Sequence, residues 1–386
     1  MEMTDLRVAL FSGNYAMTVD GANKALNRLV EYLLRQGAAV RVYSPTIAEP
    51  PFTPQGDLVS LPSFAIPGRN EYRVPMGINT SIRRDLEGFA PNVLHIASPD
   101  FSAREAAKWA RDRSIPVVAS VHTRFETYPQ YYRMGFLEPV IEAWLRKLYR
   151  RCDALLTPSP SMIDTLRSQD MNDDIGLWSR GVEHAIFNSE RRDLAWRRKL
   201  GIADDEVAIG FLGRLVLEKG LDIFGDTILE LKKRSIAHKV LIVGDGPARK
   251  SFAERVPDAC FAGFQTGTDL GRAVACMDVL LNPSVTETFG NVTLEAMACG
   301  VPVVAADATG AASLVDNGVT GYLVAPRDVS AYADKLQGYA ADPTLRKAHG
   351  AAGEKKAEAF EWDTINQAVA DTYLRVLAHK GKSTGN

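Results

Sequence analysis

The sequence predicts an α/β protein of two domains, each built on a parallel β-sheet covered by helices. Short runs of β-branched and other apolar residues alternate with longer segments of helical periodicity through most of the chain, a pattern typical of βαβ units. With 386 residues, the chain is also more than twice the usual domain length of roughly 100–150 residues. The alternation lapses after Leu177 and restarts at Val207, so one series is expected to form each domain.

The first domain is expected to span residues 1–185. Short apolar runs predict its strands at residues 7–11, 39–43, 93–96, 117–121 and 154–157. Apolar side chains that recur every three or four residues predict helices between them at residues 23–35, 102–113 and 137–151. Strands separated by helices in this way form a Rossmann-like sheet, whose ligands lie at the carboxyl ends of the strands.

The second domain is expected to span residues 206–360 and to repeat this organisation. A Gly, Pro or Asn stands close to the end of each of its predicted strands, at residues 207–212, 240–243, 259–262, 279–282, 303–306 and 321–324. Residues 186–205, which carry many charges and a short helical pattern at 193–200, are expected to connect the domains. In the last segment, 361–386, we expect a helix from about residue 362 to 378 that crosses back onto the first domain.

Composition is that of a globular enzyme and excludes several classes of protein. Apolar residues make up 46% and charged residues 24%, and Lys+Arg 45 against Asp+Glu 47 leaves no excess of charge typical of a nucleic-acid binder. Four widely spaced cysteines fit neither a zinc site nor a disulfide framework. The apolar run at residues 8–11 is too short for a secretory signal, and no stretch reaches about 18 apolar residues. We therefore expect a cytoplasmic protein that does not span a membrane.

One segment of the second domain has the features of an anion-binding site. Residues 283–304 read PSVTETFGNVTLEAMACGVPVV, in which a strand ends at the first proline and a helix begins near Gly290 and ends at Gly300. A helix start offers unpaired N–H groups and the positive end of the helix dipole, a combination that binds phosphate. Here those N–H groups belong to Phe289, Gly290, Asn291 and Val292.

Two glutamates, Glu287 and Glu295, flank this helix start. Taken singly, they also fit a solvated loop acid and a first-turn carboxylate. Together with the Phe-Gly-Asn between them and the AMACGVPVV that follows, they closely resemble the Glu-x7-Glu signature of retaining glycosyltransferases of family 4. The resemblance covers nearly the whole chain and is strongest over residues 207–324. It implies the GT-B fold, with two facing Rossmann-like domains, an interdomain cleft and a nucleotide-sugar donor.

Three other strand ends of the second domain resemble the family as well. The run GRLVLEKG after the first strand resembles the family's Gly-Arg…Glu-Lys-Gly loop, and this implies that Arg214 and Lys219, in the loop that begins at Gly213, clamp the donor diphosphate. A basic surface loop is the alternative. Gly244 lies in the VGDGP turn, which resembles the family's turn beside the nucleotide. Phe264, in FAGFQ, stands where family members hold the base, and a core position is its alternative.

The first domain contributes two further positions. Gly21, in TVDGAN, stands where the family's glycine loop bends over the donor diphosphate, although Ala22 replaces the second glycine that family members often carry. His122, in SVHTRF, ends a strand and matches the family histidine that hydrogen-bonds the donor sugar near the reacting carbon. A satisfied structural histidine is the alternative reading.

The resemblance implies transfer without a metal or any cofactor besides the nucleotide sugar, which is a co-substrate. No Asp-x-Asp motif stands at a strand end, so cationic side chains and a helix terminus are expected to neutralise the diphosphate. Our hypothesis is that the acceptor hydroxyl attacks from the face that the diphosphate leaves, with retention of configuration. His122, Arg214, Lys219 and Glu287 are the expected catalytic residues, and Glu287 binds sugar hydroxyls without forming a covalent adduct.

A membrane glycolipid is the expected acceptor. The predicted helix at residues 137–151 carries Ile141, Trp144, Leu145 and Leu148 on one side and Arg146, Lys147, Arg150 and Arg151 on its flank. With the aromatic loop before it, residues 128–151 suit an anionic lipid surface, and a core-packing helix with a solvated basic face is the alternative. HTRF and WSRGV most resemble the branch of mannosyl-, glucuronosyl- and sulfoquinovosyl-transferases. This implies a UDP- or GDP-sugar donor, a lipid or glycan acceptor, and a peripheral position on the inner face of the cell membrane.

Two other functions share this architecture. A nucleotide-sugar 2-epimerase would keep the sugar in its site and yield a new nucleotide sugar without an acceptor. A noncatalytic nucleotide-sugar binding subunit is disfavoured because every position expected to clamp phosphate is present.

Overall fold

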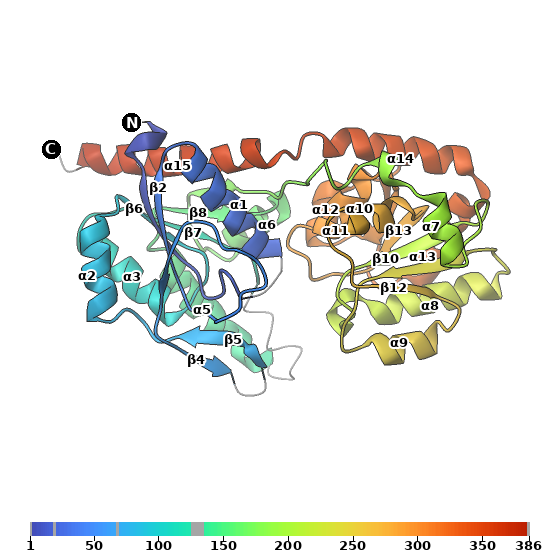
Figure 1. The fold of residues 1–386 in the computed structure, drawn as a ribbon, viewed down its shortest axis with the longest axis horizontal. Helices are drawn as coiled ribbons and strands as arrows, with labels where there is room; N and C mark the ends of the chain where they lie inside the picture. The colour runs from blue at the N-terminus through green and yellow to red at the C-terminus, as the bar shows by residue number, and fades with distance from the viewer. Residues whose placement is uncertain (1, 18–20, 67–68, 125–134, 384–386) are drawn as a thin grey trace. The chain divides into compact units, whose positions relative to one another are not determined.

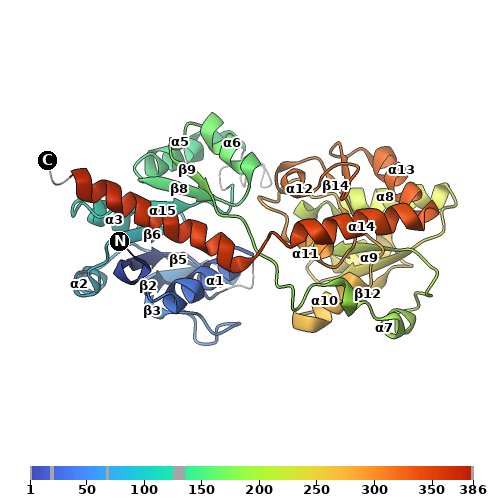
Figure 2. The same cartoon turned by 90° about the horizontal axis from the view of Figure 1, so that it is seen from above.

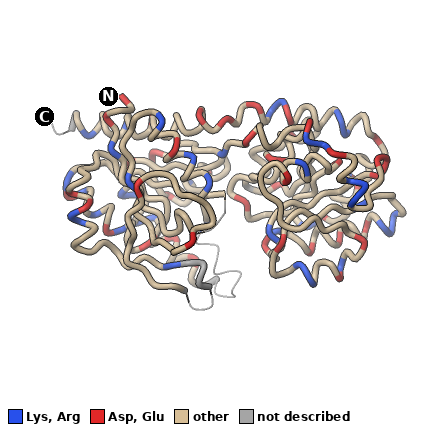
Figure 3. Tube along the Cα trace, in the orientation of Figure 1, with Lys and Arg blue, Asp and Glu red and all other residues tan. Residues whose placement is uncertain are grey.

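The computed structural model describes residues 2–17, 21–66, 69–124 and 135–383 (Figure 1). It divides into two compact units, of which unit 1 comprises Met1–Ser179 with Trp362–Asn386 and unit 2 comprises Arg180–Glu361. Each unit is a parallel sheet with helices packed on it, which confirms the predicted fold class. Positively and negatively charged residues are interspersed along both units, in keeping with the net charge of -2 (Figure 3).

Unit 1 contains a seven-stranded parallel sheet in the order β3-β2-β1-β6-β7-β8-β9. Its strands are β1 (Arg7–Phe11), β2 (Ala39–Ser44), β3 (Asp57–Ser60), β6 (Val93–Ile96), β7 (Val117–Ser120), β8 (Ala154–Thr157) and β9 (Ile175–Leu177). A separate antiparallel hairpin joins β4 (Ser63–Ile66) and β5 (Arg69–Pro75). The helices are α1 (Gly21–Arg35), α2 (Thr80–Phe89), α3 (Phe101–Arg111), α5 (Glu138–Tyr149), α6 (Pro160–Ser168) and α15 (Trp362–Ser383), with 3-10 turns at Met3–Asp5 and Gly135–Leu137.

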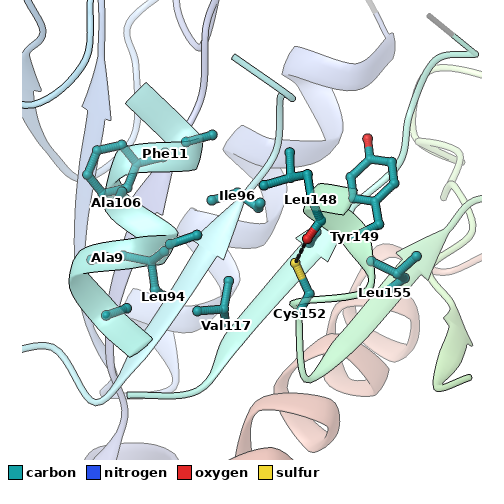
Figure 4. Packing of buried hydrophobic residues seen from close by; sticks show 14 of the residues in the cluster. Ala9, Phe11, Leu94, Ile96, Ala106, Val117, Leu148, Tyr149, Cys152 and Leu155 are labelled. Atoms are coloured by element: carbon teal, nitrogen blue, oxygen red, sulfur yellow. Dashed lines mark hydrogen bonds between the residues drawn. The ribbon is translucent and has the colours of Figure 1, made fainter. Parts of the chain in front are cut away.

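The core of unit 1 explains why its strands read as unbroken apolar runs. Strands β6, β7 and β8 are buried along their whole length, because helices cover the sheet. Figure 4 shows Phe11, Ile96 and Leu148 among the side chains that fill the space between sheet and helices. Phe11 stacks on Tyr43 with ring centroids 4.7 Å apart. This packing fixes the carboxyl ends of the strands, where polar residues begin.

The last helix, α15, belongs to unit 1, although the whole of unit 2 precedes it in the sequence. It runs beside α1 (Figures 1 and 2), and Asp363 pairs with Arg35 at 2.6 Å. Tyr373 is fully buried. Because such side chains of α15 are buried, the helix completes the core of unit 1. It extends to Ser383, five residues beyond the predicted end.

Unit 2 contains a six-stranded parallel sheet in the order β12-β11-β10-β13-β14-β15. Its strands are β10 (Ala208–Leu212), β11 (Lys239–Val243), β12 (Cys260–Gly263), β13 (Val279–Asn282), β14 (Val303–Ala306) and β15 (Gly321–Val324). Its helices are α7 (Leu194–Lys199), α8 (Leu221–Lys233), α9 (Arg249–Arg255), α10 (Gly267–Ala275), α11 (Asn291–Ala298), α12 (Thr309–Leu314), α13 (Val329–Ala341) and α14 (Pro343–Ala357), with 3-10 turns at Ser189–Arg191 and Leu217–Lys219. Separate apolar clusters fill the two faces of the sheet.

Residues 186–205, which were expected to connect the domains, pack within unit 2. The side chain of Arg197, on α7, is completely buried. Its guanidinium donates to the carbonyl oxygens of Cys276 and Glu206, both at 2.7 Å, and to the carboxylate of Asp278 at 2.8 Å. Asp193 caps the helix by accepting from the N–H of Trp196. The segment is therefore anchored to the beginning of β13.

Candidate active site

The loops that follow β10 and β13 meet because these strands are neighbours in the sheet of unit 2. Thr286 Oγ1 donates to the carbonyl oxygen of Glu218 at 3.2 Å. Gly220 has φ +71° and lies so close to Pro283 that a Cβ would stand 3.0 Å from its carbonyl oxygen. A side chain at position 220 would both strain the backbone and push the two loops apart.

An ion pair joins the two loops. Lys219 Nζ lies 3.0 Å from Glu287 Oε1, and the side chain of Glu287 is only 9% exposed whereas that of Lys219 is 32% exposed. Asn282, at the end of β13, approaches Glu287 Oε2 to 3.5 Å and donates to Thr293 Oγ1 at 3.1 Å. The structure thus holds the Glu287 carboxylate in one place and leaves part of the Lys219 ammonium accessible.

The loop around Glu287 is closed on its other side by the beginning of α12. The N–H of Gly310 donates to the carbonyl oxygen of Glu287 at 2.9 Å. A Cβ on Gly310 would stand 2.5 Å from the backbone of Phe289, so only glycine allows this approach. Phe289 is buried and its ring contacts Phe360 edge to face, with centroids 6.0 Å apart. The loop that follows β13 is therefore held on one side by the segment after β10 and on the other by the segment after β14.

Helix α11 begins where the sequence predicts an anion site. Gly290 precedes it with φ +96°, a left-handed conformation that favours glycine, and its carbonyl oxygen accepts from the N–H groups of Thr293 and Leu294. Asn291 and Val292 form the first turn of the helix, where N–H groups have no partner within the helix. Glu295 is half-buried further along the same helix.

Arg214 follows β10 directly and is exposed. It forms no ion pair with any residue that the structure describes, unlike Lys219. The neighbouring Gly213 has φ +140° and Gly244 has φ +132°, and a Cβ on Gly244 would stand 2.0 Å from the carbonyl oxygen of Gly213. A side chain at position 244 would therefore push the ends of β10 and β11 apart, whereas Gly213 is favoured by its positive φ alone, and Arg214 follows at that edge of the sheet.

Phe264 follows β12 and is 69% exposed. The alternative that placed it in the core is therefore wrong. Leu217, which stands between Arg214 and Lys219 in the sequence, is 76% exposed. Unit 2 thus presents two large apolar side chains together with cations in the segments that follow its strands, a combination that suits a ligand with an aromatic base and a phosphate.

The candidate residues of unit 1 are His122 and Gly21. Gly21 is the first residue of α1, and residues 18–20 of the predicted glycine loop lie outside the described residues. His122 stands two residues beyond β7, with its Nε2 2.9 Å from Ser120 Oγ and its ring edge to face with Trp178 at 5.1 Å between centroids. Phe125, the last residue of HTRF, is not described.

The groups behind His122 were not predicted from the sequence. Ser120 Oγ lies 2.7 Å from Nε2 of His95, a fully buried histidine in β6. The Nδ1 atom of His95 contacts the hydroxyl of Tyr373 on α15. A histidine inside the apolar run VLHI was the only sequence signal of this network, since its partner Tyr373 lies 278 residues away.

The helix expected at a membrane is α5, and its apolar side is not available to lipid. Leu145 and Leu148 are buried in the core of unit 1, and Ile141 and Trp144 pack against it. The apolar side of α5 therefore agrees with the alternative of a core-packing helix, and contact of residues 128–151 with a membrane stays a prediction. Two of the four basic residues are also partnered within the unit, since Arg146 pairs with Glu142 and Arg150 with Asp170. The aromatic residues of the preceding loop lie outside the described residues.

Known proteins match the chain over its whole length. A model of glycosyltransferase family 4 matches residues 19–185, and a model described as glycosyl transferases group 1 matches residues 206–342. The GDP-mannose-dependent alpha-mannosyltransferase of Mycolicibacterium smegmatis is 31% identical over 382 residues, covering 97% of this chain and 99% of that protein. The chain belongs to glycosyltransferase family 4. The predicted family and enzyme class are thereby confirmed.

Two further comparisons extend the family assignment. The sulfoquinovosyl transferase of Arabidopsis thaliana is 28% identical over 365 residues, covering 92% of this glycosyltransferase and 71% of the plant protein. The structure of sucrose-phosphate synthase from Thermosynechococcus elongatus superposes with a TM-score of 0.78 at 21% identity and covers 97% of this chain and 100% of that one, which shows the GT-B fold. The chain is thus a glycosyltransferase of the nucleotide-sugar-dependent type with glycolipid-related homologues, and the epimerase and binding-subunit alternatives are not favoured.

Two features are absent from the described part of the glycosyltransferase. No helix there is both long and apolar enough to cross a bilayer. No three His, Cys, Asp or Glu side chains in the described ranges gather into a group that could hold a metal ion.

Proposed function

We propose that this glycosyltransferase moves mannose from GDP-mannose to a hydroxyl of a membrane glycolipid, with retention of configuration and without a metal. The observation that carries the chemistry is the Lys219–Glu287 pair beside the start of α11, where a cation, a carboxylate held by hydrogen bonds and the first N–H groups of a helix occupy adjacent strand ends of unit 2. The full-length similarity to a GDP-mannose-dependent enzyme supports the choice of donor over UDP-sugars.

In this proposal the donor diphosphate binds to Arg214, Lys219 and the first N–H groups of α11. Charge-assisted hydrogen bonds of this kind stabilise the negative charge that develops on the leaving nucleotide. Glu287, which Lys219 and Asn282 hold in place, accepts hydrogen bonds from hydroxyls of the mannose. Phe264 offers an exposed ring on which the guanine stacks.

The transfer step exchanges one bond at the anomeric carbon for another. The bond from that carbon to the diphosphate oxygen breaks on the same face on which the acceptor oxygen forms its new bond, through an oxocarbenium-like state. The acceptor proton passes to the departing diphosphate oxygen, so GDP leaves as the only other product. His122 donates a hydrogen bond to the sugar near the reacting carbon.

The proposed acceptor is a lipid whose sugar headgroup reaches the protein from the inner face of the cell membrane. Similarity to a sulfoquinovosyl transferase supports a glycolipid acceptor. Phe136 is 75% and Val140 is 65% exposed at the beginning of α5, and Lys147 and Arg151 are exposed further along. These four side chains replace the buried apolar face of α5 as the proposed contact with anionic lipid.

A matrix of donors and acceptors tests the proposed function. Purified protein is incubated with GDP-mannose, UDP-glucose or UDP-glucuronic acid, each with a bacterial polar-lipid extract in detergent, with water-soluble sugars, or with no acceptor. We expect GDP release and an α-mannosyl lipid, identified by NMR, from GDP-mannose with lipid. Glu287→Gln provides the inactive control.

Three results would contradict parts of the proposal. A new nucleotide sugar formed without acceptor would mean epimerisation. Faster transfer from a UDP-sugar would overturn the donor, and transfer only to soluble sugars would overturn the lipid acceptor. A covalent glycosyl adduct on Glu287 would replace the proposed mechanism by a double displacement.

A further inference from the structure

A chain of buried hydrogen-bonding groups leads from the last helix to His122. It runs from the hydroxyl of Tyr373 on α15 to Nδ1 of His95, from Nε2 of His95 to Ser120 Oγ at 2.7 Å, and from Ser120 Oγ to Nε2 of His122 at 2.9 Å. Tyr373 and His95 are fully buried, and Ser120 is 2% exposed. All four residues belong to unit 1, so the chain does not depend on the placement of the two units.

Ser120 imposes a direction on this chain. A serine hydroxyl donates one hydrogen bond and accepts others, and here it contacts the Nε2 atoms of two imidazole rings. If both rings donated to Ser120, its own proton would have no acceptor among these groups, and if both accepted, one would receive no proton. One Nε2 atom must therefore donate to Ser120 and the other must accept from it.

Tyr373 decides which of the two histidines donates. Within the described residues, the only hydrogen-bond partner of its hydroxyl is Nδ1 of His95. A buried hydroxyl proton without an acceptor is unfavourable, so the hydroxyl donates and Nδ1 accepts. The proton of a neutral His95 then lies on Nε2 and is donated to Ser120. The Ser120 hydroxyl is left to donate to Nε2 of His122.

Burial keeps His95 in the neutral form that this direction requires. It lowers the pKa of His95 from 6.5 to about 3, because a buried imidazolium loses its hydration. Near neutral pH, the His95 ring thus carries a single proton, and which nitrogen holds that proton is set by the bond at the other nitrogen.

The same helix also holds the rings in place. Trp178 contacts His122 and His95 edge to face, with ring centroids 5.1 Å and 6.0 Å away. Its Nε1 donates to Asn366 Oδ1 at 3.3 Å, and Asn366 lies on α15 two turns before Tyr373. Helix α15 therefore supplies both a proton donor to the chain and an anchor for the tryptophan that packs on both histidines.

We propose that Tyr373, His95 and Ser120 are positioning residues that hold His122 in the tautomer with its proton on Nδ1. This inference rests on the proposed function in one respect, namely that the Nδ1–H of His122 is the donor to the mannose near its anomeric carbon. The other tautomer would present a lone pair at Nδ1, which cannot donate to that sugar oxygen. His95 and Tyr373, which are 278 residues apart in the sequence, thereby act together to orient His122.

Nitrogen-15 NMR of histidine-labelled protein tests the tautomer without any substrate. The chain has six histidines, and the spectrum of the His122→Asn variant identifies the signals of His122 by their loss. In the wild type we expect a protonated Nδ1 and an unprotonated Nε2 for His122, and the reverse for His95. Ser120→Ala and Tyr373→Phe should each populate the Nε2–H tautomer of His122 and lower kcat about 10-fold, as loss of a group that orients a functional histidine does.

Tyr339→Phe is the matched control. Tyr339 is fully buried in unit 2 and its hydroxyl contacts Nδ1 of His349 at 2.8 Å, so this variant removes the same kind of bond from a chain that does not include His122. We expect it to leave the His122 signals and kcat unchanged. Melting temperatures of all three variants separate loss of fold from loss of the tautomer.

The outcomes distinguish this inference from the proposed function. A wild-type His122 with its proton on Nε2 would overturn the inference, and so would an unchanged tautomer and kcat in both Ser120→Ala and Tyr373→Phe. If the tautomer shifts as expected but the wild type transfers no sugar from any nucleotide donor, the positioning chain is supported and the proposed function fails.

Discussion

Replacing Lys219 by methionine should lower kcat/KM for sugar transfer about 10²–10³-fold, because loss of one preorganised group that stabilises transition-state charge costs about 2.7–4 kcal/mol. Lys219 contacts Glu287 at 3.0 Å and is 32% exposed, so its ammonium can bind a phosphate oxygen while it holds the carboxylate. A steady-state assay with GDP-mannose and the lipid acceptor gives the measurement.

The same substitution also removes the cation from a carboxylate that is only 9% exposed, and this alone is expected to destabilise unit 2. The double variant Lys219→Met/Glu287→Gln separates the two effects. Its neutral pair should recover the melting temperature that Lys219→Met loses, but it should not recover activity. Recovery of both would mean that the pair is structural.

Lys232→Met is the matched control for this experiment. Lys232 pairs with Asp258 at 2.6 Å on the surface of the same unit, and Asp258 is 80% exposed. Exposed pairs of this kind contribute little to stability, so the melting temperature and kcat/KM should both stay near the wild-type values. A loss of less than about fivefold in Lys219→Met would contradict the role of Lys219 in charge stabilisation.

Replacing Arg197 by methionine should destabilise unit 2 by about 3–5 kcal/mol, which is the usual cost of removing one partner of a buried ion pair. Arg197 is fully buried and its guanidinium binds Asp278 and the carbonyl oxygens of Cys276 and Glu206. The substitution removes this donor from the two carbonyl oxygens and leaves Asp278 with only Arg192 and the N–H of Ala208 among its described partners. For a unit of this size the melting temperature should fall by roughly 6–20 °C, measurable by calorimetry.

The adjacent Arg198→Met is the control, because Arg198 pairs with Asp204 but is 60% exposed. Because exposed ion pairs contribute little to stability, this variant should melt near the wild-type temperature. Equal effects of the two substitutions would contradict the conclusion that residues 186–205 are anchored in unit 2 through Arg197.

The contribution of the Arg197–Asp278 pair to stability should depend on pH. Burial would raise the pKa of Asp278, but Arg192, the N–H of Ala208 and Arg197 outweigh it, so the pKa lies below its ordinary 3.8. A depressed pKa gives stability that is present above the ordinary value and is lost as the pH falls through the folded-state value. Urea unfolding of wild type should therefore lose more free energy below about pH 4 than Arg197→Met, whose Asp278 has lost one of these cations.

The features that could be predicted from the sequence are those that depend on residues close together in the chain. The segment from β13 to α11 was predictable because a buried strand, a left-handed glycine and a helix start each leave a local signal, and the structure has Gly290 at φ +96° directly before α11. Strands buried on both faces were also predictable, because they appear in the sequence as unbroken apolar runs. By contrast, β3 (Asp57–Ser60) is a half-exposed edge strand without an apolar run, and it was missed.

The features that could not be predicted depend on which helices and strands become neighbours in the fold. That Lys219 meets Glu287 follows from the pairing of β10 with β13, which no local pattern contains. The helical periodicity of residues 137–151 correctly indicated an amphipathic helix, but periodicity does not tell whether its apolar side faces lipid or a sheet. In the structure Leu145 and Leu148 face the sheet. The contact of His95 with Tyr373 likewise requires the last helix to return to unit 1.

Calorimetric titration with guanosine, GMP and GDP shows whether Arg214, Lys219 and the start of α11 bind the diphosphate of the donor. Wild type should bind GDP much more tightly than guanosine. Arg214→Ala should weaken GDP binding about 10–100-fold, the worth of one charge-assisted hydrogen bond, while binding of guanosine does not change. Equal affinities of wild type and Arg214→Ala for GDP, or equal affinities of wild type for GDP and guanosine, would contradict diphosphate binding at this site.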